Sequence, residues 1–173
     1  MNCIIYFWNR LYFGIFECHK QAQLFAFKTI EVPIGIIAKA LGHRRNPLEK
    51  NKKVVLNALT DPQKSSISRL AMQSMYIFSC CSIFALVNFS SILFPHLSLV
   101  GCNEILFFVA LGTPTFCINY FFLWRNDKYL VYYKLFEKSS RRTNRVWRWV
   151  SFLSVIGSIV LLIFSFIAMS SDN

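Results

Sequence analysis

Charged residues are missing from three long stretches of this 173-residue sequence. Over the whole chain only 16% of residues are charged and 55% are hydrophobic, a mixture too apolar for an ordinary soluble domain. The core of a bilayer is about 30 Å thick, and a helix needs about 20 apolar residues to cross it. Each of the three stretches meets this requirement. We therefore expect an all-α, multi-pass integral membrane protein.

The charge-free stretches and the residues that can start or end helices predict three transmembrane helices. Pro95 lies inside the first stretch, where a helix can end and the chain can turn. Asp61 and Pro62 suit a helix start, because Asp61 can cap free N–H groups and Pro62 has no N–H to satisfy. We expect spans at residues 70–94, 101–124 and 149–170, within a membrane domain that covers residues 62–173.

Basic residues are absent from one side of the predicted spans. All 19 Lys and Arg residues lie before the first span or between the second and the third, whereas the connection after the first span and the C-terminal tail have none. Lys and Arg near span ends are retained on the cytoplasmic side of a membrane. We expect a cytoplasmic N-terminus and a C-terminus outside, in a bacterial inner membrane or an equivalent membrane.

The net charge of +11 raises the question of nucleic-acid binding. Anionic lipids are a simpler partner, because each basic residue beside a span is attracted to them by about 1 kcal/mol. We expect contact with membrane lipids, anionic on the cytoplasmic face, and no nucleic acid. The residues predicted to contact lipid headgroups are Arg44, Arg45, Lys52, Lys53, Arg141, Arg142, Arg145 and Arg148.

Three segments are predicted to lie along the cytoplasmic membrane surface as interfacial or amphipathic helices. In the basic N-terminal region, residues 1–61, the first sixteen residues lack the basic start of a signal peptide and place apolar side chains on one helical face. Residues 21–41 are also apolar, but Pro33 and Gly35 disfavour one continuous helix, so this segment is interfacial or re-entrant. Residues 125–148 have aromatic residues near helical spacing and predict a cytoplasmic amphipathic helix.

Small residues recur every three or four positions along the third predicted span. Lipid gives helices little hydrophobic drive to associate, so close packing over small residues and interhelical hydrogen bonds hold them together. The stripe therefore predicts a helix-packing face, either for the protein's own spans or for another subunit. It consists of Ser151, Ser154, Ser158, Ser165 and Ala168, interrupted by Leu161.

Polar groups inside the first two predicted spans allow two interpretations. Asn88 and Asn119 need hydrogen-bond partners in hydrocarbon, which internal packing can supply. Pro114 frees a backbone carbonyl and predicts a kink, which occurs in transporters and also in helices with no transport role. If several copies surrounded a pore, the polar path would be lined by Asn88, Glu104, Thr113, Pro114, Thr115 and Asn119.

Motifs for catalysis and metal binding are missing as well. The six cysteines show no CxxC spacing, the three histidines are dispersed, and the HExxH, GxSxG and Walker patterns are absent. We expect no enzyme, no cofactor and no metal site. The favoured hypothesis is a non-enzymatic membrane protein that acts through helix packing, as an accessory subunit of a membrane complex or an immunity-type protein. Its partner would be another membrane protein or further copies of itself. The alternative is an oligomeric channel or transporter for ions or small molecules.

Overall fold

The computed structural model describes residues 2–40, 54, 57, 61–63, 65–94 and 103–171, and this part of the chain contains helices and no strands. The prediction of an all-α fold is confirmed. The elements, in chain order, are α1 (Cys3–Ala40), α3 (Ser66–Leu93), α4 (Glu104–Asn119), the π-helical turn η2 (Tyr120–Trp124), the 3₁₀ turn η3 (Arg125–Asp127), α5 (Lys128–Glu137) and α6 (Arg141–Ser171).

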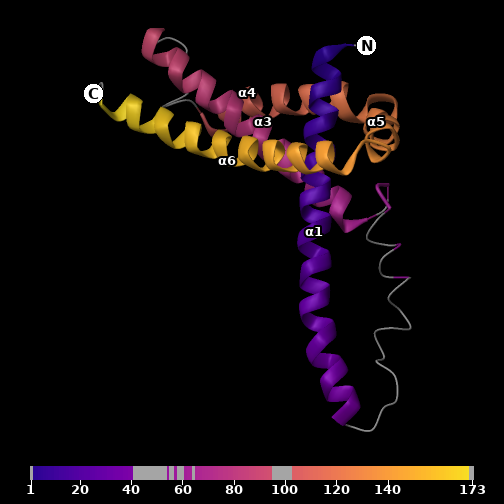
Figure 1. The fold of residues 1–173 in the computed structure, drawn as a ribbon. Helices are drawn as coiled ribbons and strands as arrows, with labels where there is room; N and C mark the ends of the chain where they lie inside the picture. Colours follow the sequence, from indigo (N-terminus) through magenta and orange to yellow (C-terminus); the bar gives the residue numbers. More distant parts are fainter. Residues whose placement is uncertain are drawn as a thin grey trace.

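Three helical stretches are long and apolar enough to cross a membrane: Ser66–Ile92, Glu104–Glu137 and Arg141–Ser170. They follow the order of the three predicted spans and fit a multi-pass integral membrane protein. Within this group α3 contacts both α4 and α6, so it is the central helix. Figure 1 shows α3 and α6 side by side, with the C-terminal ends of both helices at the same end of the bundle.

Helix α1 runs across α6 rather than along it (Figure 1). Its first half contacts α3, α5, α6 and η2, whereas its second half extends away from the other helices. The prediction that Pro33 and Gly35 break this segment is wrong, because α1 is one helix from Cys3 to Ala40 with Pro33 inside it. Proline removes one backbone hydrogen bond and favours a kink, but the turns on both sides can continue the helix.

The first membrane helix begins later than its sequence predicts. The Oγ of Ser65 accepts the N–H of Ser68 at 3.1 Å and caps α3. Asp61 instead accepts the N–H of Gln63 at 2.8 Å in a short turn that precedes the helix. The capping chemistry predicted for Asp61 is therefore present, but it serves this turn and not the start of α3.

The predicted amphipathic segment at residues 125–148 divides into two helices. The Oγ of Ser140 accepts the N–H of Thr143 at 3.2 Å, and α6 begins at Arg141. Residues 141–148 are therefore the first two turns of the third membrane helix, and the separate helix is reduced to α5. This aspect of the prediction is wrong, because the aromatic spacing gave no sign of the cap at Ser140.

A tight connection joins the second membrane helix to α5. Asn126 and Asp127 both have positive φ angles, 60° and 51°, in the left-handed region that asparagine and aspartate tolerate better than most residues. The reversal allows α5 to fold back onto α1. As a result, the apolar face of α5 packs against another helix of the same chain.

Aromatic side chains form most of the core between α1 and α5. The ring of Tyr12 lies 5.6 Å from that of Tyr129, and the rings of Phe13 and Phe16 lie 5.3 and 5.2 Å from that of Tyr133. Edge-to-face pairs at such distances add to the free energy gained by burying the rings. The buried core residues are Leu11, Tyr12, Phe13, Ile15, Phe16, Ile67, Ala71, Met75, Leu123, Tyr129, Tyr133 and Phe136.

Candidate functional site

Residues 8–19 of α1 cross over the other helices, a region called here the α1 crossing, and they include two buried polar side chains, Asn9 and Arg10. At Gly14, α1 lies close to the backbone of α6. A Cβ atom at this position would overlap the Oγ of Ser151 and lie 2.7 Å from the carbonyl oxygen of Trp147. Only a residue without a side chain fits this approach of two backbones. Gly14 therefore fixes where α1 meets α6.

Side chains of α1 also donate hydrogen bonds to the end of the second membrane helix. Asn9 donates its Nδ2–H to the carbonyl oxygen of Phe122 at 2.8 Å, and the indole N–H of Trp8 donates to Asn119 Oδ1 at 3.4 Å. Phe122 lies in η2, where π-helical geometry shifts the regular hydrogen-bond pattern. Lys128 donates to the neighbouring carbonyl of Phe121 at 2.8 Å. Side chains thus satisfy two carbonyls of this irregular turn.

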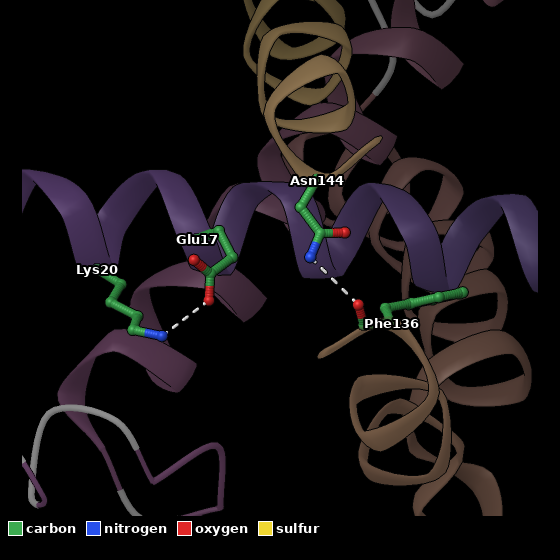
Figure 2. Close-up of polar contacts among 4 residues, drawn as sticks. All are labelled: Glu17, Lys20, Phe136 and Asn144. Carbon is green, nitrogen blue, oxygen red and sulfur yellow. Dashed lines mark hydrogen bonds and ion pairs between the residues drawn. The ribbon is translucent and has the colours of Figure 1, made fainter. Parts of the chain in front are cut away.

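Arg10 is the most buried charged side chain of the α1 crossing, with 1% of its surface exposed. Its Nη2 donates to Asn144 Oδ1 at 2.9 Å, and Asn144 in turn donates to the carbonyl oxygen of Phe136 at 3.2 Å (Figure 2). The guanidinium carbon lies 4.4 Å from the centre of the Phe136 ring and 5.7 Å from that of Trp147. Among the described residues, its Nε and Nη1 have no hydrogen-bond partner.

Aromatic rings, and not a carboxylate, lie next to the guanidinium group of Arg10 in the described structure. No carboxylate pairs with Arg10 in the described part of the chain, and burial lowers the pKa of its guanidinium. A cation over an aromatic ring is attracted by the ring's negative face. Sequence reasoning did not select Arg10 as a site residue, although its position within an apolar run was the available signal.

His19 connects α1 to the central membrane helix. Its Nε2 lies 2.9 Å from the Oγ of Ser74 in α3, and burial lowers the pKa of its imidazole below the ordinary value of 6.5. The unfolded chain therefore binds a proton at this residue at a higher pH than the folded chain does. The contribution of neutral His19 to the free energy of unfolding is fully present above about pH 6.5. It falls as the pH is lowered through that value.

We expect the thermal midpoint in detergent to drop more between pH 7.5 and pH 5.5 for the wild-type chain than for a His19→Gln variant. Glutamine keeps a hydrogen-bonding group near Ser74 but does not titrate in this range. The measurement is a melt followed by tryptophan fluorescence at both pH values, with His43→Gln as the control. Equal pH sensitivity of wild type and His19→Gln would show that another group is responsible.

Some positions of the predicted small-residue stripe of α6 are buried, and others are partly buried or exposed. Ser151, Ser158 and Ser165, which are seven residues apart, are buried, whereas Ser154 and Ala168 are partly exposed and Leu161 is 53% exposed. Ser151 faces Gly14 of α1, and Ser165 accepts a hydrogen bond from Asn88 of α3 at 3.0 Å. The buried positions of the stripe thus pack against helices of the same chain.

The residues predicted to line a polar path are divided between Asn88 on α3 and the other five on α4. Asn88 bonds to α6, whereas Asn119 donates to Ser79 of α3 at 3.0 Å and to the carbonyl oxygen of Thr115 at 2.9 Å. The buried Thr115 donates to the carbonyl of Leu111 in its own helix. Glu104 and Thr113 are exposed, and Pro114 lies within α4 and is partly exposed. The two buried asparagines therefore face different neighbours.

The basic residues predicted to contact lipid headgroups fall into two groups. Arg44, Arg45, Lys52 and Lys53 lie outside the described residues. Arg141, Arg142 and Arg145 are exposed and Arg148 is half-buried, all four in the first turns of α6. No cluster of His, Cys, Asp or Glu that could hold a metal ion occurs among the residues that the structure describes.

Comparisons with protein-family models, with curated proteins and with solved structures find no match to this chain.

Proposed function

We propose that this chain is a non-enzymatic, multi-pass membrane protein that binds another integral membrane protein through the outer half of α1, defined as residues 21–40. In this function it would serve as an accessory subunit of a membrane complex or as an immunity-type protein. The observation that supports the proposal is the division of α1 into a half that is packed within the chain and an apolar half that the described chain leaves uncovered.

The outer half of α1 exposes large apolar side chains. Phe25 is 73% exposed, and Ile30, Val32, Ile36 and Ile37 are all more than half exposed. Phe25, Val32 and Ile36 are seven and four residues apart, so they share one face of the helix. Exposed apolar side chains on one helical face are typical of protein or membrane contact sites. Because Gly14 holds the inner half against α6, the outer half projects as an arm with a fixed base.

The position of α1 supports an orientation along the cytoplasmic surface of the membrane. Its hydrogen bonds join it to the first turns of α3 and α6 and to the end of the second membrane helix. Examples are the bond between Tyr12 and Ser68 and the bond from Asn9 to Phe122. Helix α5 and the first turns of α6, both of which carry basic residues, lie at this same end of the bundle (Figure 1). By the positive-inside rule this end is cytoplasmic, and the C-terminus of α6 is outside.

The placement of the polar residues favours packing over transport. Asn88 and Asn119 are both buried and hydrogen-bonded to neighbouring helices, which is the structural use of an amide in hydrocarbon. An ion path would need several such groups to converge. Ion flux in liposomes that disappears in an Asn88→Ala variant would contradict the proposal and favour a channel.

The test is copurification in mild detergent with a variant that carries Phe25→Ser and Ile36→Ser. Because the described chain covers neither side chain, we expect the thermal midpoint to stay within error while a copurifying membrane protein is lost. The matched control carries Ile105→Ser and Phe108→Ser, which replaces two residues that are equally exposed on α4. We expect the partner to be retained in the control.

Two results would contradict this use of α1. One is a partner that is retained by the α1 variant, and the other is a partner that is lost equally from both variants. If the copurifying protein is a second copy of this chain, the contact is a homo-oligomer, and the same pair of variants shows whether α1 forms it.

A further inference from the structure

A groove of about 450 Å³ lies between α1 and α6 beside the α1 crossing. Its walls combine two cationic side chains with apolar and aromatic ones. The lining residues are Cys18, Gln21, Arg145, Arg148, Trp149 and Phe152. In α6, Trp149 and Phe152 come four residues after Arg145 and Arg148, so these four side chains share one face of that helix. The groove thus has a basic region toward the start of α6 and an aromatic region a turn further along.

The charge of this groove is not balanced by the described chain. Neither Arg145 nor Arg148 has a carboxylate partner among the described residues, and α6 contains no acidic residue. Glu17, next to Cys18 in α1, is engaged by Lys20 at 3.0 Å (Figure 2). Burial raises the pKa of the Cys18 thiol, so the thiol stays neutral and adds no negative charge. Two adjacent guanidinium groups therefore face the groove without an anion.

The aromatic region of the groove begins where the charge-free stretch of α6 begins. Trp149 is 61% exposed and Phe152 is 47% exposed, and their rings lie 6.1 Å apart in an edge-to-face arrangement. Tryptophan and arginine at the end of a membrane helix lie at headgroup level, and the residues that follow enter the hydrocarbon. The basic and aromatic regions of the groove thus match the headgroup and the acyl chains of a phospholipid.

We propose that this groove binds one anionic glycerophospholipid, with its phosphate between Arg145 and Arg148 and an acyl chain against Trp149 and Phe152. Guanidinium groups bind phosphate through charge-assisted hydrogen bonds that are roughly twice as strong as neutral ones. Gln21 adds an amide donor from the opposite wall. A soluble phosphate would use the two arginines alone, whereas a lipid also covers the two exposed rings.

The lipid site has a structural consequence for the α1 crossing. Arg148 belongs to the groove through its side chain, and its carbonyl oxygen accepts a weak bond from the Cys18 thiol at 3.5 Å. A lipid in the groove would contact α1 and α6 together. Binding therefore stabilises the crossing, because a ligand that binds only the folded arrangement favours it.

The experiment is a native mass-spectrometry titration of the full chain in detergent with phosphatidylglycerol and, separately, with phosphatidylcholine. We expect tighter binding of phosphatidylglycerol to wild type, and about a tenfold loss of that affinity in the Arg145→Gln/Arg148→Gln variant. The Lys134→Gln/Lys138→Gln variant loses the same charge from two exposed residues at the C-terminal end of α5 that are not among the predicted headgroup contacts. We expect it to stay within about twofold of wild type, because neither lysine lines the groove.

Further variants and a soluble competitor test the two regions of the site separately. We expect Arg145→Lys/Arg148→Lys to keep most of the preference and Phe152→Ala to weaken phosphatidylglycerol binding in a folded chain. Equal losses in the two glutamine variants would show general charge attraction and overturn the site. Displacement of phosphatidylglycerol by millimolar glycerol phosphate would also overturn it, because it would identify a site for a soluble anion.

Discussion

Replacement of Gly14 by alanine is expected to lower the free energy of unfolding by about 2 kcal/mol or more, a large effect for the addition of one methyl group. The added Cβ would overlap the Oγ of Ser151 and lie 2.7 Å from the backbone carbonyl oxygen of Trp147. The serine side chain can rotate, but the carbonyl belongs to a helix and cannot yield. Helix α1 would have to move away from α6, which would also stretch its bonds to α3 and η2.

Gly157 provides the matched control on α6. A Cβ at Gly157 meets no atom within 4 Å, so Gly157→Ala should leave stability unchanged or raise it slightly through better helix propensity. The measurement is unfolding in mixed micelles of increasing denaturing detergent, followed by tryptophan fluorescence. We also expect Ser151→Gly to recover some of the loss in the Gly14→Ala background, because it removes the two closest side-chain atoms. Equal stability of the two alanine variants would contradict the close contact.

The membrane helices were predictable because their signal is compositional. A charge-free run of about 20 residues is sufficient to predict a span, whatever its neighbours are. The need of Asn88 and Asn119 for partners was predictable for the same reason, since an unpaired amide is costly in hydrocarbon. Their actual partners, Ser165 and Ser79, depend on which helix faces each residue, and nothing in the local sequence determines that.

The α1 crossing could not be predicted from the sequence. The apolar spacing of residues 1–16 and of residues 125–148 suggested two faces turned toward lipid, but many of these side chains pack against each other between α1 and α5. A helical face that is covered by lipid and one that is covered by another helix have the same period. Gly14 carried no signal either, because its importance lies in a residue more than 130 positions away in the chain.

Replacement of Arg10 by alanine is expected to cost about 3 kcal/mol of stability. The change leaves a cavity where a large side chain was 1% exposed, removes the stack on Phe136, and deprives Asn144 Oδ1 of its donor. Each of these losses falls at the junction of α1, α5 and α6. We expect the alanine variant to release α5 from α1 as well as to lower the unfolding midpoint, which protease cleavage at the η3 connection would detect.

Two further substitutions of Arg10 separate its charge from its shape. Methionine fills a similar volume and removes the two donors, Nε and Nη1, that have no partner in the described structure, so Arg10→Met should cost less than about 1.5 kcal/mol. Lysine keeps the charge but loses the planar group that lies over the Phe136 ring, and its ammonium has three donors, whereas Arg10 bonds to a single acceptor, Asn144 Oδ1, in the described structure. We therefore expect Arg10→Lys to be less stable than Arg10→Met. The reverse order would show that an anion balances the charge of Arg10, because only then would preserving the charge matter more than filling the space.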